Sequence, residues 1–160
     1  LNSLKKMIFA HDLKGNIYNP RNKEIKCIVE GKARGNLIGG NLSIICSSLG
    51  TENEIDTRNK ILFIEEIGEE PYKVDRMLLQ LVQAGKINDC AGIIFGYFSS
   101  CEPSNPNQSL TISEVIKELI KPCGKPIIAG VACGHSLPSL TLPMGVEVVI
   151  DSKNKNIKII

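Results

Sequence analysis

The sequence lacks tryptophan, has only two histidines and is poor in aromatic residues, which make up 4% of its 160 residues. It also lacks the run of about 18 apolar residues that a membrane-spanning helix needs. The apolar stretch near its first residue is too short for a signal peptide. With a net charge of +2, neither a nucleic acid nor a membrane is expected as a partner. Because the chain begins with Leu1, we expect it to be a piece of a longer product.

The cysteines form no C-x-x-C pair, and several lie in apolar segments. The pattern therefore favours free thiols in a reducing cytoplasm over a disulfide framework or a zinc site. We expect a cytoplasmic protein with no cofactor and no bound metal. The six cysteines are Cys27, Cys46, Cys90, Cys101, Cys123 and Cys133.

A serine nucleophile in a recognisable setting is also missing. No G-x-S-x-G elbow occurs, and no serine has the strand–turn–helix context that would expose its hydroxyl. Cys133 lies two residues before His135, so a Cys–His pair is an alternative, although two such close loop residues need not face each other. The Gly39–Gly40–Asn41 turn matches neither phosphate-loop nor dinucleotide spacing, so nucleotide binding is not expected.

Apolar strand-like runs alternate with helical patterns, which predicts a layered α/β domain over residues 25–160. Asn41, Pro71 and either Thr111 or Ser113 are expected to begin helices. Residues 1–24 are rich in turn signals and are predicted to be irregular, as an interdomain connection or a remnant of a preceding domain. The expected helices cover 42–49, 71–85 and 111–120, and the expected strands cover 26–30, 31–40, 61–65, 91–96, 126–130, 141–142, 146–150 and 157–160.

Two of these strands end in residues that can perform acid–base chemistry. Glu65 and Glu66 end the strand that begins at residue 61, and His135 follows the strand at 126–130 behind Gly134. Functional groups in open α/β sheets gather beyond the carboxyl ends of the strands. A carboxylate and an imidazole there are two members of a nucleophilic triad. Strand alternation is expected to point only one glutamate inward, and the local pattern does not say which.

Several segments resemble, in order, the carboxyl-terminal domain of the LD-carboxypeptidase family of serine peptidases. The resemblance covers the chain from about residue 31 to its end. The matching strings are GKARGNLIGGNLS (31–43), GT (50–51), ILFIEE (61–66), PYKVDRML (71–78), GIIFG (92–96), GH (134–135) and LPMG (142–145).

The resemblance implies a swivelling β/β/α domain with a largely parallel sheet, flanking helices and a β-rich carboxyl-terminal end. It also implies a Ser–Glu–His triad whose Glu65 and His135, 70 residues apart, lie in this chain. The serine would come from an amino-terminal domain that the sequence lacks, so this chain alone should be inert. The implied reaction releases terminal D-alanine from cytoplasmic murein tetrapeptide in peptidoglycan recycling, and a homodimer would fit the family.

Two other functions compete with this hypothesis. A microcin-immunity peptidase of the same family would cleave a peptide–nucleotide, but the low aromatic content favours the cell-wall substrate. A binding module that uses the fold without chemistry is the alternative from a different class. A Ser-bearing elbow encoded upstream would distinguish an enzyme from such a module.

Overall fold

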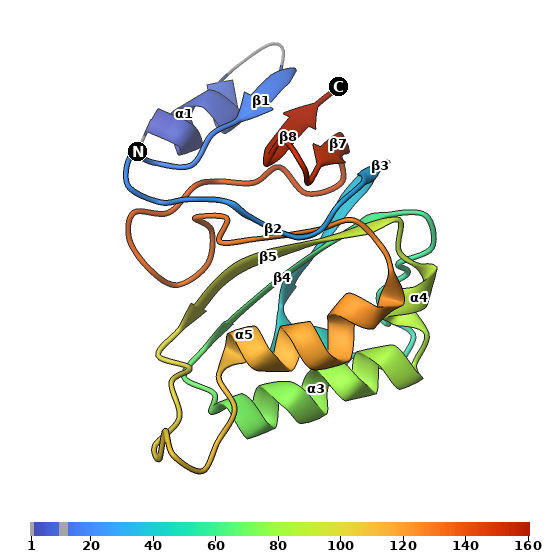
Figure 1. Cartoon of the computed structure of the whole chain (residues 1–160). Coiled ribbons are helices and arrows are strands. Elements are labelled where there is room, and N and C mark those ends of the chain that lie inside the picture. The colour runs from blue at the N-terminus through green and yellow to red at the C-terminus, as the bar shows by residue number, and fades with distance from the viewer. Residues whose placement is uncertain (1, 10–12) are drawn as a thin grey trace.

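The computed structural model describes residues 2–9 and 13–160 and contains an eight-stranded sheet (Figure 1). Its strand order is β1-β8-β7-β3-β4-β5-β6-β2. The four central strands, β3 to β6, run parallel, whereas β2 on one side and β7, β8 and β1 on the other pair antiparallel. The strands are β1 (Gly15–Ile17), β2 (Lys26–Val29), β3 (Lys32–Asn41), β4 (Ile61–Ile67), β5 (Gly92–Ser99), β6 (Ile127–Ala129), β7 (Glu147–Asp151) and β8 (Asn156–Ile159).

Helices cover one face of the central strands, as the alternating pattern predicted. They are α2 (Leu42–Ser47), α3 (Pro71–Gln83), α4 (Lys86–Asp89) and α5 (Ile112–Val115), and α5 continues through a π turn (Ile116–Ile120) and a 3₁₀ turn (Lys121–Cys123). The predicted helix starts are confirmed: the Asn41 side chain caps α2, Pro71 opens α3, and Thr111 forms a capping box ahead of α5.

The opposite face of the central strands is also covered, because the sheet's antiparallel strands β1, β7 and β8 lie over it, so the domain has three layers (Figure 1). Figure 1 shows α3 and α5 on one side of β4 and β5, with β1, β7 and β8 on the other. One apolar cluster joins the helices to the central strands, and a second lies between the central strands and the layer formed by β1, β7 and β8. This arrangement confirms the predicted α/β domain with flanking helices and a β-rich carboxyl-terminal end.

Strand β3 connects the parallel and antiparallel parts of the sheet. Its first half pairs with β7 and its second half with β4. Gly39 has a φ of +125°, and a Cβ atom there would lie 1.9 Å from the Phe63 carbonyl oxygen. Only glycine therefore allows β3 to approach β4 closely enough to place Asn41 beside Glu65.

The structure corrects two sequence predictions. Residues 1–24 are not irregular throughout, because they include helix α1 (Asn2–Phe9) and strand β1, which pairs with β8 and buries Ile17. Residues 141–142 form no strand and lie in an irregular segment that packs on the sheet. His11 lies outside the described residues. Within residues 2–9 and 13–160, no helix is both long and apolar enough to cross a membrane.

Candidate active site

Glu65 and Glu66 at the end of β4 point to opposite faces of the sheet, and both are buried, with 5% and 2% of their surfaces exposed. The expectation that only one would point inward was wrong, because layers cover both faces. Glu66 follows Leu62 and Ile64 on the helix side, whereas Glu65 follows Ile61 and Phe63 on the other side.

Glu66 is fully engaged in holding β4 to helix α2. Its carboxylate accepts hydrogen bonds from Asn41 Nδ2 (2.7 Å), Ser43 N (2.8 Å), Ser43 Oγ (2.6 Å) and Ile67 N (2.8 Å). Burial acts to raise the pKa of Glu66, but the bonds from Ser43, Ile67 and Asn41 outweigh it and lower the pKa below its ordinary value. These contacts give Glu66 a structural role.

Glu65 meets the histidine that the sequence singled out. Glu65 Oε2 lies 2.8 Å from His135 Nδ1, and the His135 side chain is 51% exposed. Because a carboxylate can only accept a hydrogen bond, the imidazole donates from Nδ1, and in a neutral ring Nε2 is then the acceptor. The structure thus joins a buried carboxylate to an accessible imidazole from segments 70 residues apart.

Gly134 makes room for this contact. It has a φ of +131°, and a Cβ atom on it would lie 2.7 Å from Glu65 Oε2. A side chain at residue 134 would therefore collide with the carboxylate that His135 binds. A glycine at this position thus allows the close approach between the loop and the end of β4.

Cys133 is a poor nucleophile, although it lies only two residues before His135 in the sequence. Burial, followed by the charge of Glu65, raises the pKa of the Cys133 thiol to about 11. The reactive thiolate would then be only about 10⁻⁴ of the thiol population at pH 7. The geometry supports a Glu–His pair rather than a Cys–His pair.

The serines beside the two glutamates and the histidine have other partners. Ser136 Oγ lies 2.5 Å from Ser99 Oγ, and Ser43 Oγ donates to Glu66. Neither hydroxyl has a hydrogen bond to His135 in the described part of the chain. In the described ranges 2–9 and 13–160, no three His, Cys, Asp or Glu side chains lie together in a way that could hold a metal ion.

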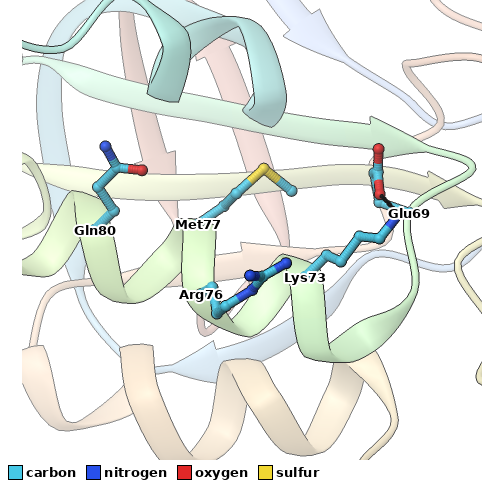
Figure 2. A pocket seen from close by; sticks show the side chains of 5 residues that line it. All are labelled: Glu69, Lys73, Arg76, Met77 and Gln80. Atoms are coloured by element: carbon cyan, nitrogen blue, oxygen red, sulfur yellow. Dashed lines mark ion pairs between the residues drawn. The ribbon is translucent and has the colours of Figure 1, made fainter.

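A separate pocket lies along α3 on the helix side of the sheet. Figure 2 shows its lining, with Lys73 paired to Glu69 at 2.8 Å and the side chains of Arg76, Met77 and Gln80 beside them. The Arg76 guanidinium lies 5.3 Å from the Tyr72 ring centroid, a cation–π contact. This pocket includes neither Glu65 nor His135.

The structure is a layered α/β domain that brings a buried carboxylate to an accessible imidazole. Residues 34–150 match the family model described as the LD-carboxypeptidase C-terminal domain. The chain therefore belongs to this family of carboxypeptidases, as the resemblance predicted.

The relatives include a carboxypeptidase and a self-immunity protein. A probable murein peptide carboxypeptidase from Bacillus subtilis is 46% identical over 128 residues, which are 80% of this chain and 40% of that protein. The microcin C7 self-immunity protein MccF from Escherichia coli is 34% identical over 134 residues, 81% of this chain and 37% of that protein. The chain thus spans about 40% of the length of these curated relatives.

Solved structures confirm the fold. MccF in complex with glutamyl sulfamoyl guanosine superposes with a TM-score of 0.86 at 26% identity, covering 99% of this chain and 53% of that chain. The muramoyltetrapeptide carboxypeptidase from Oxalobacter formigenes has a TM-score of 0.81 at 26% identity, covering 98% and 52%. The β/β/α layering is therefore that of known family members.

Proposed function

We propose that this chain is the carboxyl-terminal domain of a serine-type L,D-carboxypeptidase that releases terminal D-alanine from murein tetrapeptide. Glu65 and His135 would be two members of its Ser–Glu–His triad. The observation that carries the proposal is the 2.8 Å contact between Glu65 Oε2 and His135 Nδ1, which leaves the accessible imidazole edge free.

The geometry suits each residue to one role. His135 Nε2 would take the proton from the serine hydroxyl as that oxygen attacks the peptide carbonyl, and would return it to the leaving D-alanine amine. Glu65 would hold the Nδ1–H tautomer and stabilise the imidazolium that forms. General acid–base transfer of this kind contributes about 10²–10⁴-fold to the rate.

The nucleophile would come from an amino-terminal domain outside this chain. The curated relatives are longer proteins, of which this chain spans about 40%. Ser136, directly after His135 in sequence, is hydrogen-bonded to Ser99, and Ser43 is hydrogen-bonded to Glu66. We therefore propose that the isolated chain forms no acyl-enzyme, and that the complete enzyme acts in cytoplasmic peptidoglycan recycling.

The test is D-alanine release from murein tetrapeptide by the longer protein, by its His135→Ala variant and by this chain alone. We expect release by the longer protein only, with the variant folded because the half-exposed His135 adds little to the core. Turnover by the isolated chain would contradict the proposal that the nucleophile lies outside these residues. An active His135→Ala variant would contradict the triad.

A microcin-immunity activity is the second candidate, favoured by the likeness to MccF. That protein is described in complex with glutamyl sulfamoyl guanosine, an aminoacyl nucleoside. The absence of tryptophan and the 4% aromatic content give this chain little surface for stacking a base, which favours the murein peptide. Parallel assays on murein tetrapeptide and on an aminoacyl sulfamoyl nucleoside distinguish the two functions.

A further inference from the structure

The carboxyl end of β5 is irregular at the level of Glu65. The pairing of β4 with β5 shifts register between Ile64 and Glu66. Two residues of β5, Gly96 and Tyr97, therefore lie opposite the single residue Glu65. A bulge of this kind bends a strand and redirects its side chains, and bulges are frequent beside active sites.

Tyr97, which the bulge redirects, holds the His135 loop on both sides of the histidine. Its backbone N–H donates to the Cys133 carbonyl at 2.8 Å, two residues before His135. Its phenol donates to the Pro138 carbonyl at 3.0 Å, three residues after His135. One residue of β5 thereby spans the segment that carries the imidazole.

Other contacts fix the Tyr97 side chain. Its Cβ lies 3.3 Å from the position that a Cβ atom on Gly134 would take, so the tyrosine packs directly against the loop. Lys23, on the amino-terminal segment, places its Nζ 5.7 Å from the centroid of the Tyr97 ring. Burial, followed by the influence of Cys133, raises the pKa of the Tyr97 phenol, so it remains a hydrogen-bond donor at neutral pH.

Ser99 adds a second attachment from the same strand. Its buried hydroxyl lies 2.5 Å from Ser136 Oγ, on the residue directly after His135. The loop is therefore tied to β5 before the histidine, directly after it and three residues after it. By contrast, the imidazole itself makes one hydrogen bond in the described structure, to Glu65.

We propose that Tyr97 and Ser99 are positioning residues for His135. Their hydroxyls hold the loop so that Nδ1 stays on Glu65 and Nε2 keeps a fixed direction toward the incoming nucleophile. The catalytic part of this inference rests on the proposed function. Displacing a reacting group by about 1 Å can cost about 10²-fold in rate, so loss of either tie should lower turnover.

The kinetic test compares Tyr97→Phe and Ser99→Ala in the longer protein, with Tyr72→Phe as the matched control. Tyr72 is 53% exposed on α3 and distant from these ties in the sequence, and its variant likewise loses one hydroxyl. We expect kcat to fall about tenfold for each test variant with KM unchanged. The control should keep its activity, and Ser99→Thr, which retains a hydroxyl, should recover most of the kcat.

A second readout needs no substrate. Imidazole ¹⁵N signals of this chain report which ring nitrogen carries the proton, and with two histidines the His135→Ala variant assigns them. We expect the Nδ1–H tautomer in the wild-type chain and a mixture of tautomers in Tyr97→Phe and Ser99→Ala. The spectra test the positioning role even if no peptidase substrate is found. Failure of the proposed function would appear only in the kinetic test, so the two failures can be told apart.

Two results would overturn the inference. One is a wild-type tautomer signature in both test variants. The other is a fall in kcat that Ser99→Thr does not recover and that follows only the loss of thermal stability, because that pattern marks an ordinary structural role.

Discussion

Removing the Glu66 carboxylate should destabilise this domain much more than removing that of its neighbour Glu65. Glu66 is 2% exposed and accepts hydrogen bonds from four donors on Asn41, Ser43 and Ile67. Glu65 has one hydrogen-bond partner in the described structure, the half-exposed His135. Glu66→Ala therefore leaves four hydrogen-bond donors without their acceptor, whereas Glu65→Ala, at the adjacent buried position, leaves one.

The magnitude follows from the donors that lose their partner. A hydrogen bond to a charged group contributes about 1.5–3 kcal/mol, and a buried donor left unpaired costs about 1–3 kcal/mol. The four bonds are not additive, and deleting the carboxylate also removes the cost of burying its charge. We therefore expect Glu66→Ala to lower the free energy of unfolding by about 3–5 kcal/mol, a large share of the typical ~5–15 kcal/mol.

Urea unfolding and thermal melting of the 160-residue chain measure this effect directly. At about 2–4 °C per kcal/mol for a domain of this size, Glu66→Ala should melt roughly 6–20 °C lower. Glu65→Ala should lose about 1 kcal/mol or less, since it breaks a single bond to a group that water can reach. A loss below about 1 kcal/mol for Glu66→Ala would refute the reasoning.

The pH dependence gives an independent check on the same carboxylate. The pKa of Glu66 lies below its ordinary value of 4.5, because the hydrogen bonds to the carboxylate outweigh the effect of burial. A depressed folded-state pKa contributes stability above the unfolded pKa and loses it as the pH falls. The difference in unfolding free energy between wild type and Glu66→Ala should therefore be largest at pH 7 and should become smaller below about pH 4.5. A gap that stays constant down to pH 3 would show that the charge is not responsible.

The remaining predictions concern the Glu65–His135 pair. In the longer protein, Glu65→Gln should lower kcat about 10³–10⁴-fold with little change in melting temperature, as measured by D-alanine release and thermal melts. Gly134→Ala should lower kcat and stability together, because its Cβ would lie 2.7 Å from Glu65 Oε2, whereas Gly145→Ala, also at positive φ but in open space, should keep its kcat. Cys133→Ala should retain kcat within about threefold, since a thiol with a pKa of about 11 supplies almost no thiolate at neutral pH.

The parallel strands and the helix starts could be predicted because local signals and burial agree there. β4 and β5 are continuous apolar runs, which suits strands covered on both faces. Asn41 and Pro71 supply the cap and the first-turn residue that a helix start needs. Each of these signals acts over only a few residues, so it can be recognised in the sequence.

The short strand β1 could not be predicted in the same way. Gly15 and Asn16 are turn-forming residues, and their extended conformation depends on pairing with β8, more than 140 residues later in the chain. Residues 141–142 show the converse, since Leu142 packs on the second apolar cluster without joining a strand. In both cases contacts with distant parts of the chain, rather than local signals, decide the conformation.

The two glutamates show why strand alternation alone could not identify the candidate active-site carboxylate. Alternation separates them by face, but layers bury both faces, so exposure does not distinguish them. Their partners do: fixed donors near the start of α2 saturate Glu66, whereas Glu65 meets only an imidazole on a loop 70 residues away. A carboxylate already committed to four donors cannot also orient an imidazole, and one with a single accessible partner can. The proposed division of roles therefore follows from hydrogen-bond capacity, which strand pattern does not encode.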